Sequence, residues 1–230
     1  KSNVSTDEEW VPPEEPETGT RVAAFPGAFR QTDLGNAERL VARYRDRIRY
    51  CPQRRKWLLW DRTRWRWDES LAIERMAQRT VREIYREAAD CDDDKLRKAL
   101  FGWAIKSEQA KMLKSMVGLA QSQDGVTVQP AELDADPWLL NVANGTIDLR
   151  SAMLGPHDRQ QLITRTTGVE YDPQATSELW TRVLSEACGG DQELATYLQR
   201  VVGYSLIGRP LERALFFLFG PPGTAKSTII

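Results

Sequence analysis

The sequence predicts an α+β fold that is mainly helical: a helical bundle with small β-hairpins, followed by the first strand and the phosphate-binding loop of an α/β ATPase core. Three observations predict it. Apolar residues recur at helical spacing along two long stretches between residues 68 and 121. Asn144-Gly145 separates two runs of strand character, which is the pattern of a hairpin. Further on, six apolar residues (214–219) precede a loop rich in glycine and proline.

The chain divides into three expected segments. Residues 1–30 should be a disordered or extended linker, because four prolines lie among small residues. Residues 1–18 also hold six acidic residues and only one basic residue, Lys1. Residues 31–175 should form the helical and β-hairpin domain. Residues 176–230 should hold two further helices and then the first strand and phosphate-binding loop of the ATPase domain.

Helices are predicted from capping residues and apolar spacing. The first should begin at Asp33 or Asn36 and run to about Arg47. Two long helices should span residues 68–90 and 93–121. Because only a few residues separate these two, they should pack as an antiparallel pair.

A first hairpin is predicted between these helices, with strands over residues 56–60 and 65–67. Strand side chains alternate, so Trp65 and Trp67 should share one face of the hairpin. We interpret these two tryptophans, with Trp57 and Trp60, as core residues. Arg64 and Arg66 should then lie on the other face.

A second hairpin should cover residues 138–149, with a type I′ turn at Asn144-Gly145. Residues 161–165 could add a short strand. A helix capped by Thr176 or Ser177 and another starting at Asp191 should follow, each with one apolar side turned inward. The second of these should end near Gly208.

The sequence after the predicted strand 214–219 is typical of an ATP site. Glycines let the backbone curl around an anion, and successive N–H groups then converge on phosphate oxygens. Lys226 would reach the β- and γ-phosphates of ATP, and Ser227 would be a ligand of Mg²⁺. The predicted nucleotide-binding residues are Gly220, Pro221, Pro222, Gly223, Thr224, Ala225, Lys226, Ser227 and Thr228.

One position departs from the G-x-x-x-x-G-K-[ST] pattern: Ala225 replaces the second glycine. The loop resembles that of the minichromosome-maintenance helicases and some related AAA+ ATPases, which tolerate alanine there. The alternative is a chance Gly/Pro turn before an ordinary helix. The chain starts at Lys1 and stops three residues after Ser227. We therefore expect a piece of a larger enzyme, with little ATPase activity of its own, since the acidic pair and arginine finger of hydrolysis come later.

Composition indicates a folded domain. The 230 residues are 41% hydrophobic and 28% charged, and the longest apolar run is about six residues, far below the ~18 of a membrane span. His157 is the only histidine, which excludes a His/Cys zinc site. We expect reduced thiols at Cys51, Cys91 and Cys188. A run of aspartates, Asp90 and Asp92–Asp94, is interpreted as a helix cap and not as a metal site.

The charge distribution indicates a nucleic-acid contact. Residues 43–66 hold ten bases against Asp46 and Asp61, although the net charge of the whole chain is only −1. The alternative is that these bases form a solvated face. The candidate DNA-binding residues are Arg54, Arg55, Lys56, Arg62, Arg64 and Arg66.

Several motifs, in order, resemble one family of replication proteins. They are TDLGNAERLVARYRDRIRYCPQRRKWLLWD, DPWLLNVANGTIDLR, DQELATYLQRVVGYSLIG and the phosphate-binding loop. Together they cover about residues 30–228. They look like the region before the superfamily 3 helicase core in phage- and plasmid-type primase–helicases, to which poxvirus primase–helicases are related.

This resemblance implies a multidomain DNA replication protein. It would have a primase or polymerase domain upstream, a hexameric ATP-driven helicase, ATP with Mg²⁺ as cofactors, and single-stranded or forked DNA as partner. It implies the cytoplasm of a bacterial host and no membrane. Two alternatives stay open: a stand-alone DNA- or partner-binding module with the loop as a trailing segment, and a remodelling AAA+ ATPase unrelated to DNA.

Overall fold

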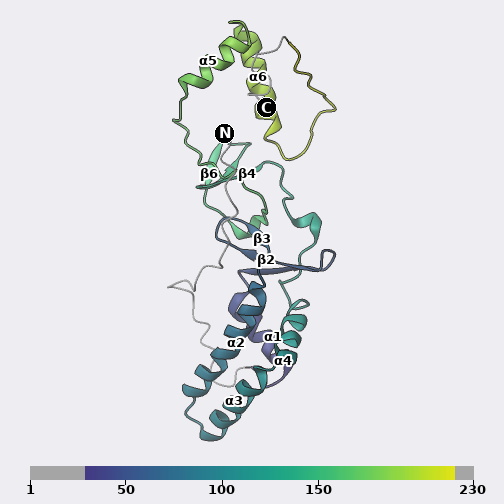
Figure 1. The fold of residues 1–230 in the computed structure, drawn as a ribbon, viewed down its shortest axis with the longest axis vertical. Coiled ribbons are helices and arrows are strands. Elements are labelled where there is room, and N and C mark those ends of the chain that lie inside the picture. The colour runs from purple at the N-terminus through teal and green to yellow at the C-terminus, as the bar shows by residue number, and fades with distance from the viewer. Residues whose placement is uncertain (1–28, 221–230) are drawn as a thin grey trace. The chain divides into compact units, whose positions relative to one another are not determined.

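The computed structural model describes residues 29–220, which fall into two units. Unit 1 comprises the chain up to Leu133 together with Arg159–Thr164, and unit 2 comprises the rest. Within the described residues the fold is mixed α+β, with six α-helices and two small three-stranded antiparallel sheets. The predicted combination of helices with small hairpins is confirmed there, and no α/β ATPase core is formed by residues 29–220. Figure 1 labels the elements.

Unit 1 contains four helices, one sheet and two single 3₁₀ turns. Its elements are α1 (Asp33–Tyr44), β1 (Ile48–Cys51), β2 (Lys56–Trp60), β3 (Trp65–Trp67), α2 (Ala72–Ala89), α3 (Asp94–Ser107), α4 (Ala110–Ala120), η1 (Pro130–Glu132) and η2 (Arg159–Gln161). The short strand suggested for residues 161–165 is not formed: η2 ends at Gln161, and residues 162–165 have no regular secondary structure.

The start of α1 differs from the prediction. Its N-cap is Thr32, whose side-chain oxygen accepts a hydrogen bond from the backbone N–H of Gly35 at 3.0 Å. Asp33 lies inside the first turn. Asn36 is fully buried, and its side-chain oxygen accepts a hydrogen bond from Trp103 Nε1 at 2.9 Å. Asn36 is therefore a core residue and not a cap.

The helix also ends earlier than predicted, at Tyr44 and not near Arg47. The backbone N–H of Arg47 bonds the carbonyl of Tyr44 at 2.7 Å, which closes a turn, and a strand follows. Ile48 opens this strand, β1, and is paired with Leu59 of β2. The apolar spacing up to Ile48 fits a helix as well as a strand, because Ile48 is buried in either conformation. The spacing therefore did not predict β1.

The predicted first hairpin is confirmed with its strand bounds, and β1 completes a sheet of order β1-β2-β3. Both faces of this sheet are covered. Trp57 and Leu59 face the helices, whereas Leu58 and Trp65 belong to a separate cluster on the opposite face. Trp67 packs against that second cluster, so the two tryptophans of β3 share a face as predicted.

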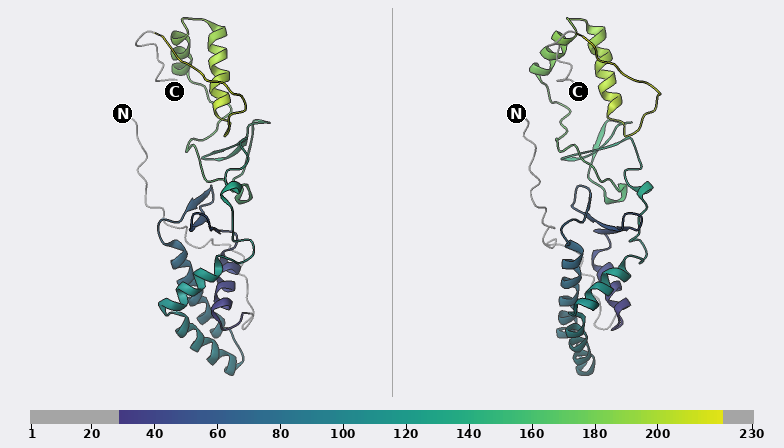
Figure 2. Two further views of the ribbon diagram at one scale, coloured as in Figure 1. Left: turned by 90° about the vertical axis from the view of Figure 1, so that its right-hand side faces the viewer. Right: turned by 45° about the vertical axis from the view of Figure 1, so that its right-hand side comes forward.

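The main core of unit 1 lies between the helices and one face of the sheet. In Figures 1 and 2, α1 and α4 lie side by side and α2 passes alongside them. Burial of the apolar side chains between these elements is the main contribution to the stability of unit 1. The core consists of Ala37, Leu40, Val41, Tyr44, Ile48, Trp57, Leu59, Ala72, Ile73, Met76, Ala77, Val81, Met116, Ala120 and Val126.

The long helix predicted over residues 93–121 is two helices, α3 and α4. Gln109, between them, has an extended backbone (φ −62°, ψ 138°). The two parts pack differently: α3 packs mainly against α2, whereas α4 packs mainly against α1 and also contacts α2. A straight helix could not make both contacts. The cap at Asp93 is confirmed, because its side chain accepts hydrogen bonds from two backbone N–H groups of α3.

A buried ion pair joins α1 to α2. The side chains of Arg39 and Glu87 are only 3% and 11% exposed, and Arg39 Nη2 lies 3.1 Å from Glu87 Oε2. Arg39 also donates to the carbonyl oxygens of Phe29 and Arg30 at 3.3 and 3.2 Å. It therefore holds the chain that leads into α1 against the helices.

Unit 2 contains the second sheet and two helices. Its elements are β4 (Leu139–Val142), β5 (Gly145–Asp148), β6 (Met153–Gly155), α5 (Glu178–Ala187) and α6 (Gln192–Ser205). The second hairpin is confirmed, but β6 was not predicted. The caps at Ser177 and Asp191 are confirmed by side-chain hydrogen bonds to the first backbone N–H groups of α5 and α6.

The predicted type I′ turn is wrong. The register pairs Val142 with Gly145, so the two loop residues are Ala143 and Asn144, and neither has a positive φ. Gly145 is required for another reason: a Cβ there would lie 2.3 Å from the carbonyl oxygen of Gly155 in β6. The glycine thus lets β6 approach β5.

An exposed ion pair closes the base of this hairpin. Arg150 donates to both carboxylate oxygens of Asp136 at 2.8 and 3.0 Å. Desolvation acts to raise the pKa of Asp136, but hydrogen bonds from the Trp138 backbone N–H and from Arg150 outweigh it, and the net pKa lies below its ordinary value. Asp136 is therefore ionised at neutral pH.

The predicted inward faces of α5 and α6 are only partly buried. No residue of either helix is fully buried, and Trp180 is 43% exposed. Residues 214–219, predicted as a buried strand, form no strand, and Phe217 is 78% exposed. No second strand lies beside them among the described residues, and an unpaired strand leaves its backbone groups without partners.

Candidate functional site

The structure describes only the first residue of the predicted nucleotide-binding loop. Gly220 is exposed, and Pro221–Thr228 lie outside the described residues. Lys226 and Ser227 therefore stay predictions from the sequence. The segment that leads to the loop, residues 211–219, is exposed throughout.

The candidate DNA-binding residues lie at two ends of the sheet in unit 1. Arg54 and Arg55 lie in the turn between β1 and β2, Lys56 is the first residue of β2, and Arg62 and Arg64 belong to the turn after β2. These turns are separated by the length of β2, which is about 13 Å at the usual rise of a strand. Five of the six candidates therefore form two groups and not one patch, and Arg66 lies within β3, opposite Leu59.

Local chemistry explains the turn between β2 and β3. Asp61 accepts hydrogen bonds from the backbone N–H groups of Thr63 and Arg64, both at 2.8 Å, through one carboxylate oxygen. This is an Asx-type turn, and it projects Arg62, which has a positive φ of 83°. Arg62 is exposed and has no side-chain partner among the described residues.

Most of the other candidates already have partners. Arg64 lies 3.9 Å from Asp61, and Lys56 lies 3.5 Å from Glu69. Arg54 lies over the ring of Trp67 at 5.2 Å. These are exposed or half-buried contacts of small energy, so they leave the cations available to phosphate.

Arg66 is fixed by the sheet itself. It pairs with Leu59 in the register, on the face opposite Trp65 and Trp67, as predicted from strand alternation. It is half-buried and makes an interaction within the chain. Arg64 and Arg66 are therefore the two least exposed of the six candidates, and a large ligand reaches them least easily.

The tryptophans of the hairpin are structural. Trp65 is fully buried, and its indole N–H donates to the carbonyl of Arg159 at 2.8 Å. Trp57 is 7% exposed, and Trp60 and Trp67 are half-buried. The interpretation as core is confirmed for Trp57 and Trp65, whereas Trp60 and Trp67 pack, partly buried, against the cluster that contains Trp65.

Two cations next to Trp65 were not among the predicted residues. Arg49 lies 4.9 Å from the centre of the Trp65 ring, and Arg159 forms an ion pair with Asp46 at 3.1 Å. Burial lowers the pKa of Arg49 below its ordinary value, with the charges of Arg159 and Arg45 adding to this effect and Asp46 opposing it. Arg159 is distant in sequence from residues 43–66, so no local signal could have placed it there.

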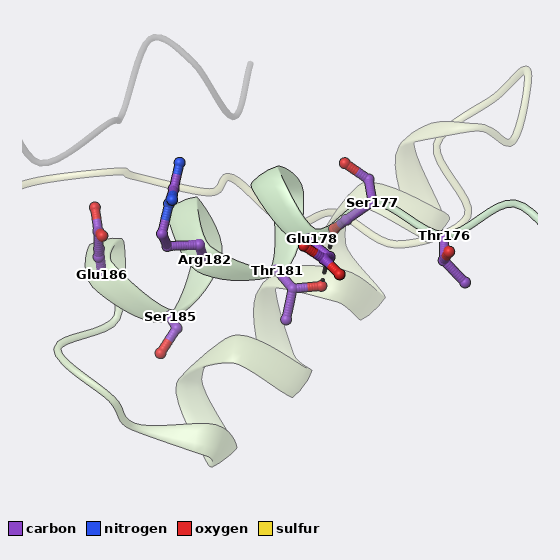
Figure 3. A pocket seen from close by; sticks show the side chains of 7 residues that line it. All are labelled: Thr176, Ser177, Glu178, Thr181, Arg182, Ser185 and Glu186. Carbon is purple, nitrogen blue, oxygen red and sulfur yellow. Dashed lines mark hydrogen bonds between the residues drawn. The ribbon is translucent and has the colours of Figure 1, made fainter.

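A surface hollow of about 430 Å³ lies along α5 in unit 2. Figure 3 shows its lining, which runs from Thr176 to Glu186 and comes from this helix and its N-terminal approach. Thr181 Oγ1 is bound within the helix, to the Ser177 carbonyl at 3.1 Å. Because one exposed helix supplies all the side chains, no set of groups converges on a ligand, and we assign it no function.

Residues 29–220 contain neither a cluster of metal ligands nor a helix that could cross a membrane. No group of three or more His, Cys, Asp or Glu side chains in that part of the chain could hold a metal ion. Cys51, Cys91 and Cys188 are free and buried. None of the helices in the described region has the length and apolar character that crossing a membrane requires.

Comparison with known proteins identifies a family match. Residues 37–189 match the family model described as "D5 N terminal like", which is more than half of the chain. The match begins in α1 and ends just after α5, so it includes the sheet and all four helices of unit 1. No curated protein matches the chain.

Proposed function

The chain belongs to the family of D5 N-terminal-like domains, and from this premise we propose that it is part of a DNA-replication primase–helicase of the phage or plasmid type. Domains of this family are found in poxvirus and phage or plasmid primase–helicases, before the superfamily 3 helicase domain. The family match over residues 37–189 is the observation that carries the proposal. The phosphate-binding pattern that starts at Gly220 follows the matched region, just as the helicase domain follows this domain in primase–helicases.

Within this proposal, Gly220–Thr228 is the ATP-binding loop of the helicase. Lys226 contacts the β- and γ-phosphates, and Ser227 is a ligand of the Mg²⁺ that ATP brings. The whole protein assembles as a hexamer, has a primase or polymerase domain upstream, and moves along single-stranded or forked DNA. The chain's own part is to bind ATP at this loop and DNA through the cations of unit 1.

Replacing Lys226 with alanine is expected to weaken the binding of Mg-ATP by about 10- to 150-fold, because a charge-assisted hydrogen bond contributes roughly 1.5–3 kcal/mol. Titration of the purified chain with a fluorescent ATP analogue measures this. Lys111→Ala, which removes an exposed lysine of α4, is the control and should leave binding unchanged. Equal affinity in the Lys226 variant would show that the loop is an ordinary turn.

Reversing Arg62, Arg64 and Arg66 to glutamate is expected to weaken binding of single-stranded DNA. Each phosphate contact contributes about 0.7 to the slope of log affinity against log salt. Loss of all three contacts would therefore reduce that slope by about 2. Fluorescence anisotropy at two salt concentrations measures affinity and slope together.

The group at the other end of the sheet gives a matched comparison. Arg54, Arg55 and Lys56 are also three cations, and all three are exposed. If only one of the two triple variants loses affinity, the DNA path runs past that end. If neither triple variant loses affinity, the hairpin cations are a solvated face.

A second candidate function is a DNA- or partner-binding module that does not use the loop. One observation favours it: among the described residues, the hydrophobic clusters of unit 1 consist entirely of residues before position 165. This candidate predicts that the chain cut after Gly208 folds and binds as the whole chain does. Loss of DNA binding on that cut would contradict it.

A further inference from the structure

A row of arginines runs along the exposed side of α2. Arg75, Arg79, Arg82 and Arg86 recur at intervals of four, three and four residues, which places them on one face of a helix. We call this row the α2 arginine stripe. The apolar residues of α2, among them Ile73, Ala77 and Ile84, are buried on the opposite side. The stripe therefore faces away from the core of unit 1.

Two of the three acids of α2, Glu83 and Glu87, are paired with arginines of α1, and the third, Glu74, is exposed in the first turn. Glu87 is held by Arg39 at 3.1 Å, and Glu83 contacts Arg43 at 3.2 Å, both from α1. Glu83 also reaches Arg86, at 2.6 Å, which is the stripe's one ion pair within the described residues. Glu83 and Glu87 are thus turned toward α1.

The two middle arginines of the stripe, Arg79 and Arg82, have no side-chain partner within residues 29–220. Neither Arg79 nor Arg82 makes a side-chain hydrogen bond, ion pair or ring contact with any described residue. Arg75 donates only to the carbonyl and hydroxyl oxygens of Ser70, at the start of the helix. Arg75, Arg82 and Arg86 are exposed to solvent, and Arg79 is half-buried.

This arrangement does not contribute to the stability of the helix. Exposed helical faces are stabilised by opposite charges three or four residues apart, whereas like charges at these spacings repel. The stripe contains three successive like-charged pairs: 75–79, 79–82 and 82–86. Such repulsion is relieved when a chain of anions binds along the stripe.

We propose that the α2 arginine stripe binds the phosphate backbone of single-stranded DNA. The proposal rests on the function proposed above and adds a second contact surface, distinct from the β2–β3 hairpin. Eleven residues of helix rise about 16 Å, which matches several successive phosphates and not a single anion. Arginine suits this partner, because its planar guanidinium forms paired hydrogen bonds with phosphate oxygens.

The stripe predicts binding without sequence preference. All four side chains are cationic, and no aromatic ring lies among them, so they contact backbone and do not read or stack on bases. The nearest ring on the helix, Tyr85, donates instead to Glu108 at 3.0 Å. Affinity for strands of equal length and different sequence should therefore be the same.

The test is an anisotropy titration of the purified chain with single-stranded DNA, comparing wild type with Arg79→Glu/Arg82→Glu. Neither side chain forms a hydrogen bond or ion pair with residues 29–220, so the two replacements should leave the midpoint of the unfolding transition unchanged. We expect the variant to bind about tenfold more weakly, with a slope against log salt reduced by about 1.4, since each contact contributes about 0.7.

The matched control is Lys95→Glu/Lys98→Glu on α3. Both lysines are exposed and without a side-chain partner among the described residues, and the change in net charge is the same. If the α2 arginine stripe is a specific DNA-binding surface, the control variant should bind DNA at least several-fold more tightly than the α2 variant. Equal loss in both variants would mean that only net charge matters, and it would overturn the proposal.

The remaining outcomes separate this proposal from the one on which it rests. If wild type binds DNA and the α2 variant binds it equally well, with the same slope of log affinity against log salt, the stripe does not bind DNA. The proposed function then still stands. If wild type does not bind at low salt, both fail. Binding of an acidic peptide in preference to DNA, lost in the α2 variant, would assign the stripe to a protein partner and overturn the proposal.

Discussion

Replacing Trp65 with alanine is expected to destabilise unit 1 by about 3–5 kcal/mol, the usual cost of removing a large buried aromatic side chain. Trp65 is fully buried in the cluster that covers the face of the sheet opposite the helices. It lies 5.7 Å from the ring of Trp60. The substitution also removes the indole N–H that the carbonyl of Arg159 accepts, which leaves a polar group without its partner.

Urea unfolding measured by far-UV circular dichroism and by tryptophan fluorescence tests this prediction. Trp65→Phe is the informative comparison, because it keeps most of the buried ring and loses the hydrogen bond. It should cost clearly less than alanine. A Trp65→Ala chain that unfolds like wild type but binds DNA more weakly would contradict our assignment and make Trp65 a base-stacking residue.

Glu87→Ala is expected to cost about 3–5 kcal/mol, because breaking a buried ion pair leaves an uncompensated charge behind. The charge left behind is that of Arg39, whose side chain is 3% exposed. Arg39 would keep only the carbonyl oxygens of Phe29 and Arg30 as acceptors. These neutral groups do not balance a guanidinium charge in a desolvated position.

Two further variants make this second prediction specific. Arg39→Met/Glu87→Leu removes both charges and should be much closer to wild type than Glu87→Ala, as buried pairs replaced by apolar residues usually are. Glu69→Ala breaks the exposed pair with Lys56 and should change stability by less than about 1 kcal/mol. A double variant as unstable as Glu87→Ala would mean that the ion pair is not the source of the loss.

The parts of the fold that follow from local chemistry could be predicted from the sequence. Caps at Asp93, Ser177 and Asp191 each depend on a side chain that bonds N–H groups two or three residues ahead. The strands around Asp61 could be predicted for the same reason, because the turn is formed by that residue's own carboxylate. In these places the sequence neighbours are the interaction partners.

Features that depend on distant residues could not be predicted in this way. The break at Gln109 lets α4 pack mainly against α1 while α3 packs mainly against α2, although the apolar spacing continues through it. The strand that begins at Ile48 is fixed by its pairing with Leu59. The turn before Gly145 was misjudged because Gly145 serves the approach of β6 and not the turn itself.

The candidate site shows the same division. The basic composition of residues 43–66 is visible in the sequence, but the separation of Arg54 from Arg62 by the length of β2 requires the sheet. Arg159 reaches Asp46 only through the tertiary fold. The α2 arginine stripe, in contrast, follows from helical spacing alone, and counting charges by helix face would have found it.

The most direct test of the account is whether the chain binds single-stranded DNA through unit 1. The measurement is an anisotropy titration of the purified wild-type chain with a labelled oligonucleotide at two salt concentrations. We predict binding at low salt that weakens steeply as salt rises, because released counterions drive the association. Absence of binding at low salt would contradict the account and leave the cations of unit 1 as a solvated surface.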